Sequence, residues 1–297
     1  MAVAQTQTVK VSVIKKFTEI TKIRLSVSVV FSSVAGYLLG CDTIDFMALL
    51  LLSIGGYCMV GASNVYNQML EKDVDALMDR TKGRPLPAGT MSTTTAGVIA
   101  VTFTIIGLTV LYMINPQTAM FGGISIFMYV ALYTPLKPRT PLSVFVGAFP
   151  GAIPFMLGWV AATNEFGMEP GVLFMIQFFW QFPHFWAIGW FLFEDYKKGG
   201  FFMLPNGKRN KGTAIQVIFY TVWTILGSLI PAFNVTGDLK LSIVAAILIG
   251  AIGLWMLYYA IRLYKLQTDK AAKQLMLVSV SYITLLQVIF VVDKFIR

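Results

Sequence analysis

Long, nearly uninterrupted apolar runs constrain this chain more strongly than any other feature of its sequence. A helix needs about 20 apolar residues to cross the hydrocarbon core of a bilayer. The runs of this kind fall near residues 25–41, 46–66, 93–114, 117–134, 142–163, 171–192, 213–234, 241–262 and 274–293. We therefore expect an all-α fold, a polytopic membrane bundle of nine transmembrane helices.

The composition indicates that this bundle makes up the whole chain. Of the 297 residues, 57% are hydrophobic and only 12% are charged, whereas soluble domains carry about 25% charged residues. Too few polar residues remain to solvate a second, soluble domain. We expect one domain over residues 1–297, with residues 1–22 as a cytoplasmic N-terminal segment.

The distribution of basic residues predicts the orientation of the bundle. With the N-terminus in the cytoplasm, 20 of the 23 Lys and Arg residues lie in the N-terminal segment or in the connections on that same side. The positive-inside rule describes such a bias. The C-terminus is therefore expected on the opposite side, and the polar connections after the second, fourth and sixth spans are expected to face the cytoplasm.

We attribute the net charge of +9 to these basic residues, which set the orientation in the membrane. Nucleic acid is therefore not expected as a partner. Residues 1–24 lack the Arg- and Ser-rich composition of a transit peptide. This favours a multi-pass protein of a bacterial inner membrane, with the lipid bilayer as its surroundings, over a mitochondrial protein.

Polar residues gather where the second apolar run ends. Asn67, Glu71 and Asp75 are spaced i, i+4 and i+8, which places them on one helical face about 12 Å long. Asn64 lies near the same stripe, one turn earlier. The like charges repel each other, and a divalent cation would offset that repulsion. Carboxylate and amide oxygens without His or thiolate suit Mg²⁺.

Basic residues follow this acidic stripe. Arg80 and Arg84 present planar guanidinium groups that match the oxygens of a phosphate. Acid, metal and base together describe a site that holds a diphosphate. Three other charges in this stretch are interpreted as solvated residues outside the site: Lys72, Asp73 and Asp79.

The pattern NxxxExxxD followed by "RTKGRPLP" resembles the first aspartate-rich motif of the UbiA-type intramembrane prenyltransferases. The Asn, the second Asp and the two arginines match that motif. Glu71 replaces the first Asp, and Gln68 stands where many relatives carry Asp. "YTPLK" resembles the YxxxK segment of the family, which implies that Lys137 lies near the diphosphate.

The second acidic motif of the family, DxxxD, is only partly present. Asp195 matches the later Asp, whereas Phe191 occupies the earlier position. The adjacent Glu194 is the expected substitute. The resemblance therefore implies one complete metal-binding cluster and a second, thinner one.

Residues 177–205, "QFFWQFPHFWAIGWFLFEDYKKGGFFMLP", resemble the branch of this superfamily that transfers a farnesyl group to a vinyl group of haem B. The resemblance implies farnesyl diphosphate and haem B as substrates, Mg²⁺ as cofactor and ionisation of the allylic diphosphate as the key step. It also implies a partner that takes the product, either a haem A-forming enzyme or a haem–copper oxidase.

His184, the only histidine, lies in this segment. A lone histidine inside a membrane is a functional candidate, here as a haem contact or a proton relay. The alternative is a structural hydrogen bond between helices. The density of aromatic residues around His184 suits protection of a carbocation, but aromatic residues also pack membrane cores.

These arguments assign the candidate residues. The catalytic candidates are Asn67, Glu71, Asp75, Arg80, Lys137, His184 and Asp195. The candidates for binding the diphosphate are Arg80, Arg84, Lys137 and Lys198. The candidates for binding haem are His184 and Trp186. The candidate metal ligands are Asn67, Glu71, Asp75, Glu194 and Asp195.

Two other hypotheses stay open. A UbiA-type enzyme that acts on a quinone precursor or a chlorophyll-type ring would share the diphosphate half of the site and differ only in its acceptor pocket. A membrane transporter of an anionic metabolite would also suit basic cytoplasmic loops. The acidic stripe would repel an anion without a bound metal, however, and the spans show no clear inverted repeat.

Overall fold

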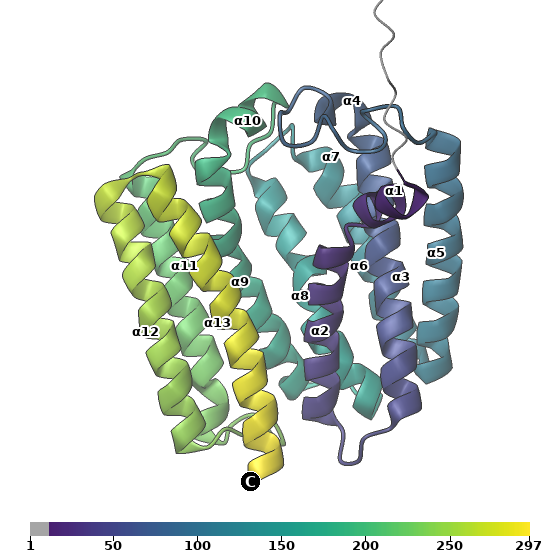
Figure 1. Cartoon of the computed structure of the whole chain (residues 1–297). Coiled ribbons are helices and arrows are strands. Elements are labelled where there is room, and N and C mark those ends of the chain that lie inside the picture. Colours follow the sequence, from purple (N-terminus) through teal and green to yellow (C-terminus); the bar gives the residue numbers. More distant parts are fainter. Residues whose placement is uncertain (1–11) are drawn as a thin grey trace, which may run out of the picture.

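The computed structural model describes residues 12–297, and over that range it contains helices and no strand (Figure 1). The earlier part of the predicted N-terminal segment, residues 1–11, lies outside the described residues. The helices are α1 (Val13–Ile20), α2 (Ile23–Gly40), α3 (Phe46–Leu70), α4 (Lys72–Asp75), α5 (Thr93–Ile114), α6 (Pro116–Phe127), the π-helix η1 (Met128–Tyr133), α7 (Thr134–Leu136), α8 (Leu142–Thr163), α9 (Met168–Phe191), α10 (Phe193–Lys198), α11 (Lys211–Leu229), the 3₁₀-helix η2 (Ile230–Phe233), α12 (Ile243–Leu266) and α13 (Asp269–Ile296).

Eight helical segments within residues 12–297 are long and apolar enough to cross a membrane. They are α2, α3, α5, α6 together with η1 and α7, α8, α11 together with η2, α12 and α13. The remaining predicted span corresponds to α9, whose 24 residues are also long enough. Polar residues such as Gln177, Gln181 and His184 lower its hydropathy. The predicted all-α membrane bundle is confirmed, whereas the count of nine stays a prediction.

The helices run up and down between two ends of the bundle. Figure 1 shows α1, α4, α7 and α10 near one end and the C-terminus at the other end. Helix α9 packs against α8, α11 and α13, and α2 packs against α3, α8 and α13. The short connections that carry the predicted site are therefore gathered at one end of the bundle. The side of the membrane that this end faces stays a prediction.

Two glycines allow α2 and α8 to approach each other closely. A Cβ atom on Gly158 would overlap the carbonyl oxygen of Ser33, and a Cβ atom on Gly36 would overlap that of Phe155. Small residues at such contacts let membrane helices gain van der Waals packing that lipid cannot supply. The contact between α2 and α8 therefore depends on these glycines.

Replacing Gly158 by Ala is expected to destabilise the protein by about 1–3 kcal/mol, because one backbone must move away from the other. Thermal unfolding in detergent measures the change. Gly171 on α9 is the matched control, since a Cβ atom there meets nothing within 4 Å, and Gly171→Ala should be neutral or slightly stabilising. Equal melting temperatures for Gly158→Ala and the unmodified protein would show that the contact between α2 and α8 does not depend on Gly158.

The first and last spans also meet. Gln287 of α13 donates a hydrogen bond through Nε2 to Ser32 Oγ of α2 at 3.0 Å. The Nζ of Lys294 donates to the carbonyl oxygens of Leu38 at 3.2 Å and Leu39 at 2.8 Å, and it also donates to Cys41. These carbonyls belong to the last turn of α2 and lack partners within that helix. Helix α13 thus caps α2.

Candidate active site

The acidic stripe forms as the sequence predicted. Helix α3 ends at Leu70, but the amide of Asp75 donates to the carbonyl of Glu71 at 2.7 Å, so the helical path continues into α4. Asn67, Glu71 and Asp75 are at most 6% exposed. Two carboxylates and an amide are therefore buried together at the end of one membrane helix.

Each buried carboxylate is paired with a base, Glu71 with Lys137 from the connection before α8 and Asp75 with Arg84 from the connection before α5. The Nζ of Lys137 lies 2.8 Å from Glu71 Oε1, and the Nη1 of Arg84 lies 2.6 Å from Asp75 Oδ2. Lys137 is itself only 7% exposed, and its Nζ lies 4.6 Å from the centre of the Tyr133 ring. The structure thus brings together four charged residues that the sequence assigned to the site.

Unsatisfied oxygens in this cluster fit a cation. Asp75 Oδ1 is buried and accepts no hydrogen bond, and the ion pair at Glu71 Oε1 is not aligned as a hydrogen bond. The Nδ2 of Asn67 donates to Thr134 Oγ1 at 3.2 Å. Buried acceptors without donors are costly, and oxygen ligands of this kind suit Mg²⁺.

Asn67, Glu71 and Asp75 are too few to enclose a metal ion, so a metal bound here must take its remaining ligands from water or substrate. Residues 12–297 contain no group of three or more His, Cys, Asp or Glu residues placed to hold a metal ion. Mg²⁺ commonly binds through one or two carboxylates and completes its shell with water and substrate phosphates. Asn67, Glu71 and Asp75 meet that requirement.

The π-helix η1 shapes the wall of the cluster. Its last residue, Tyr133, lies 5.2 Å from Tyr129, measured between ring centres, and Thr134 Oγ1 donates to the carbonyl of Tyr129 at 2.8 Å. A Cβ atom on Gly147 of α8 would lie 2.6 Å from the Tyr133 ring, so this glycine makes room for the ring. π-helical turns are often found at functional sites. Here the turn places aromatic rings beside Lys137.

Lys22 lies close enough to this cluster to feel its charges, although it forms no direct ion pair with Glu71 or Asp75 and the sequence suggested only a topological role for it. It has φ of +49° and ψ of +55°, a left-handed conformation that costs a residue with a side chain about 1 kcal/mol or more. Burial, together with the positive charges of Arg84 and Lys137, lowers the pKa of Lys22 to about 7, while Glu71 and Asp75 act in the opposite direction. No local sequence signal announces such a turn at a lysine.

Helix α10 covers the cluster through Asp195. The two oxygens of this carboxylate accept hydrogen bonds from the backbone amides of Asp79 at 2.7 Å and Arg80 at 3.3 Å. The guanidinium carbon of Arg80 lies 5.6 Å from the centre of the Tyr196 ring. Asp195 therefore positions the turn that carries Arg80, and its role as a metal ligand stays a prediction.

The other predicted residues of α10 lie in exposed ion pairs. Glu194, whose side chain is 66% exposed, lies 2.7 Å from Arg209 Nη2. Lys198 pairs with Asp79. Hydrogen bonds from Lys198 and Lys82 lower the pKa of Asp79 to about 2. Asp79 is thus not merely solvated, and the predicted roles of Glu194 as a metal ligand and Lys198 as a diphosphate contact require these pairs to open.

The two candidates for haem binding lie on α9. His184 Nδ1 is hydrogen-bonded to Ser279 Oγ of α13 at 2.9 Å, and its ring stacks on Trp180 with 4.8 Å between centres. This is the structural hydrogen bond between helices that the sequence left open as an alternative. Trp186 is buried, its Nε1 donates no hydrogen bond, and its ring packs against Tyr220. Contact of either residue with haem stays a prediction.

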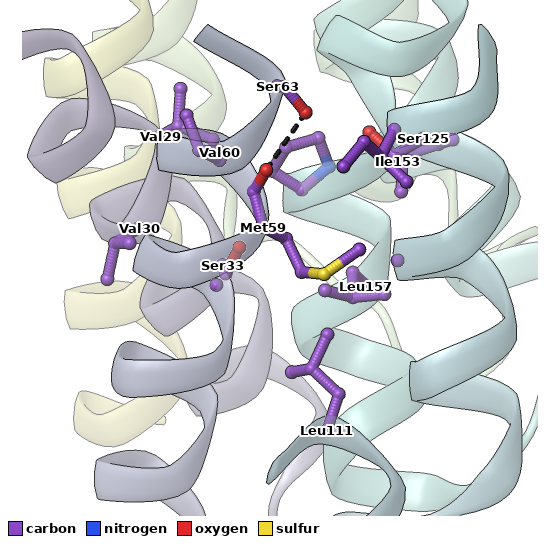
Figure 2. Close-up of a pocket in the computed structure, with 14 residues that line it drawn as sticks. Val29, Val30, Ser33, Met59, Val60, Ser63, Leu111, Ser125, Ile153 and Leu157 are labelled. Atoms are coloured by element: carbon purple, nitrogen blue, oxygen red, sulfur yellow. Dashed lines mark hydrogen bonds between the residues drawn. The ribbon is translucent and has the colours of Figure 1, made fainter. Parts of the chain in front are cut away.

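Mostly apolar residues of α2, α3, α5, α6 and α8 line a cavity (Figure 2). Ser63 lines it and donates to the carbonyl of Met59 at 2.9 Å. Ser63 precedes Asn67 by one turn of α3, so the cavity lining and the acidic stripe are one helical turn apart on that helix. The charged cluster thus has an apolar chamber next to it.

Comparison with known proteins gives consistent results. The UbiA prenyltransferase family matches residues 29–283. The chain is 71% identical over 286 residues to a protein named Protoheme IX farnesyltransferase from Christiangramia forsetii, which covers 96% of this chain and 95% of the relative. It is 42% identical over 280 residues to a protein of the same name from Cytophaga hutchinsonii, covering 93% and 96% of the two chains.

The fold is also similar to solved structures. A digeranylgeranylglyceryl phosphate synthase aligns with a TM-score of 0.79 and 20% identity, covering 96% of this chain and 99% of that one. A UbiA homologue from Archaeoglobus fulgidus bound to DMAPP and Mg²⁺ aligns with a TM-score of 0.71 and 15% identity, covering 95% and 98%. At these identities the likeness concerns the fold alone.

Proposed function

This chain belongs to the UbiA prenyltransferase family, and from that premise we propose that it transfers the farnesyl group of farnesyl diphosphate to a vinyl group of haem B. Relatives that cover nearly the whole chain carry the name of that activity. The observation that carries the proposal is the buried cluster of acids and bases next to an apolar cavity. A diphosphate with a long apolar tail needs both parts.

The two buried ion pairs suggest how the diphosphate is received. Lys137 and Arg84 neutralise Glu71 and Asp75 while no ligand is bound. On binding, both bases exchange their carboxylate partners for diphosphate oxygens. Asn67, Glu71 and Asp75 would then hold Mg²⁺, which when bound stabilises negative charge on the diphosphate as a Lewis acid. Each charge keeps a partner in both states, which limits the cost of burying it.

The chemistry requires cleavage of the bond between C1 of the farnesyl group and the diphosphate oxygen. The electron pair leaves with the diphosphate, and contacts from Lys137 and Arg84 stabilise the growing negative charge. We assign a third cationic contact to Arg80, whose backbone amide is held by Asp195. A vinyl carbon is a weak nucleophile, so stabilisation of the leaving group must supply most of the rate enhancement.

The allylic cation that forms must be protected from water. The faces of Tyr129 and Tyr133 attract a cation, and the apolar cavity excludes water from the prenyl chain. The π electrons of the vinyl group form the new carbon–carbon bond. Water then adds to the resulting cation and loses a proton, which gives a hydroxyethylfarnesyl group.

The proposal also covers the orientation of the bundle in the membrane. We count α9 as a membrane span, which brings the total to nine. We place the end that carries α4, α7 and α10 in the cytoplasm of a bacterial cell, because the basic residues concentrate there. Farnesyl diphosphate, a charged substrate, then enters from the cytoplasm. The product would pass to a haem A-forming enzyme or directly to a haem–copper oxidase.

The direct test is incubation of the purified protein with haem B, farnesyl diphosphate and Mg²⁺, followed by mass spectrometry of the haem. We expect a farnesylated, hydrated haem, and chelation of the metal should abolish its formation. A prenylated phenolic or chlorophyll-type acceptor, with no haem product, would favour another branch of the family. Metal-independent uptake of a labelled anion into vesicles, again with no haem product, would favour a transporter.

Lys22 provides a sharper test of the diphosphate site. Lys22→Met should raise the KM for farnesyl diphosphate about tenfold, because the proposed diphosphate site would lose a nearby positive charge, while the KM for haem should not change. Arg24→Met is the matched control, since Arg24 is exposed two residues later. Equal KM values for the two variants would remove Lys22 from the site.

A further inference from the structure

Helix α1 has an apolar face and a charged face. The apolar face carries Val13, Ile14, Phe17 and Ile20, and the charged face carries Lys15, Lys16 and Glu19. At 100° per residue, these two sets fall on opposite sides of the helix. An eight-residue amphipathic helix beside a membrane bundle has the pattern of an element that lies in the interface.

Only half of the apolar face packs against the protein. Ile20 is fully buried, and the Phe17 ring meets that of Phe103 on α5 edge to face, with 5.9 Å between centres. Val13 and Ile14, at the other end of α1, are 81% and 75% exposed. These two side chains extend the buried face of α1 beyond the bundle, beside helices whose own exposed residues are apolar. The acyl chains of lipids would suit the exposed side chains of Val13 and Ile14.

The charged face indicates which headgroups would meet it. Lys15 is exposed, and Lys16 Nζ donates to the carbonyl of Thr90 in the connection before α5, which fixes the charged face toward that end of the bundle. Arg24 is exposed nearby. Basic residues flanking an inserted apolar face favour anionic lipids.

Side chains of α3 join α1 to the active site. Gln68 Nε2 donates to the carbonyl of Ile20 at 2.7 Å, and Asn64 Nδ2 donates to that of Thr21 at 3.3 Å. Gln68 thus holds the end of α1 from the position where many relatives carry Asp. It lies between Asn67 and Glu71 in the sequence of α3, and the left-handed turn at Lys22 follows at once. Movement of α1 would therefore shift Lys22 relative to the charged cluster that influences it.

We propose that α1 binds the anionic phospholipid surface of the bilayer and that this binding holds Lys22 at the diphosphate site. The second half of this proposal rests on the proposed function, because it assigns Lys22 to diphosphate binding. Affinity for farnesyl diphosphate would then depend on the lipid composition of the membrane, through the population of the docked state of α1.

Spin labels test the position of α1 independently of any activity. A label at Ile14→Cys should be relaxed by membrane-dissolved oxygen, and a label at Lys15→Cys by a water-soluble nickel complex. The native Cys41 and Cys58 are both buried, which directs labelling to the new thiol. Both labels reporting water in phosphatidylglycerol-containing nanodiscs would overturn the proposal.

Kinetics in nanodiscs test the link to Lys22. The KM for farnesyl diphosphate should be about fivefold lower in discs containing phosphatidylglycerol than in pure phosphatidylcholine. Val13→Ser with Ile14→Ser should abolish that difference, whereas Val98→Ser with Ile105→Ser, on the exposed face of α5, should retain it. An inserted Ile14 label with a lipid-independent KM would overturn the link. A haem product absent in every disc, with the label still inserted, would instead count against the proposed function.

Discussion

Replacing Asp75 by Asn is expected to lower the rate of farnesyl transfer by about 1000-fold or more, since catalysis would lose a charge that acts on the leaving group. Asp75 is 1% exposed and bonded to Arg84 at 2.6 Å, with its second oxygen free of hydrogen bonds. Asn keeps the shape but offers a single, neutral acceptor oxygen. The haem product formed per unit time, measured across a range of Mg²⁺ concentrations, is the readout.

Asp73→Asn is the control for this experiment. Asp73 is exposed two residues before Asp75, so its loss changes the net charge equally but should leave the rate within a factor of about two. Melting temperatures of both variants separate lost catalysis from lost folding. A rate near that of the unmodified protein for Asp75→Asn would exclude this carboxylate from the site.

Replacing Lys137 by Met is expected to remove activity and to destabilise the fold by about 3–5 kcal/mol, because Glu71 would stay buried without its partner. The double variant Lys137→Met with Glu71→Gln should regain much of the stability, since no buried charge then lacks a partner. Its activity should stay absent, because both the base and the carboxylate are missing. Denaturation curves and the haem assay measure the two effects separately.

Lys211 offers a matched position for this pair of variants. Its Nζ also lies over an aromatic ring, 5.6 Å from the centre of Tyr264, but the residue is exposed. Lys211→Met should change stability by less than about 1 kcal/mol. Normal turnover in Lys137→Met, or no recovery of stability in the double variant, would contradict the role of the buried pair.

Most of the architecture and the first cluster could be predicted because they depend on local patterns. Apolar runs specify the spans. Asn67, Glu71 and Asp75 stay on one face beyond the end of α3 because the helical path continues into α4. The resemblance of "YTPLK" to a family motif pointed to Lys137, which indeed lies beside Glu71. The orientation of the bundle and the assigned roles stay predictions.

The parts that escaped prediction depend on long-range contacts. Lys22 reaches the cluster through a left-handed turn that no neighbouring residue encodes, and His184 finds its partner Ser279 on a helix 95 positions later. Glu194 pairs with Arg209 within the connection between α9 and α11, and Lys198 pairs with Asp79 of the connection before α5. A sequence pattern records which residues lie on one helix face, but not which base approaches them from elsewhere.

The cap that α13 places on α2 has a consequence for how the protein is made. Ser32 and Gln287 lie 255 positions apart, so α2 enters the bilayer long before its partner has been synthesised. Until Lys294 emerges, the last carbonyls of α2 have no protein donor from α13, and water at that end of the helix must serve as their partner. Loss of the residues from Lys294 onward would remove this donor permanently and weaken the contact that joins the first span to the last.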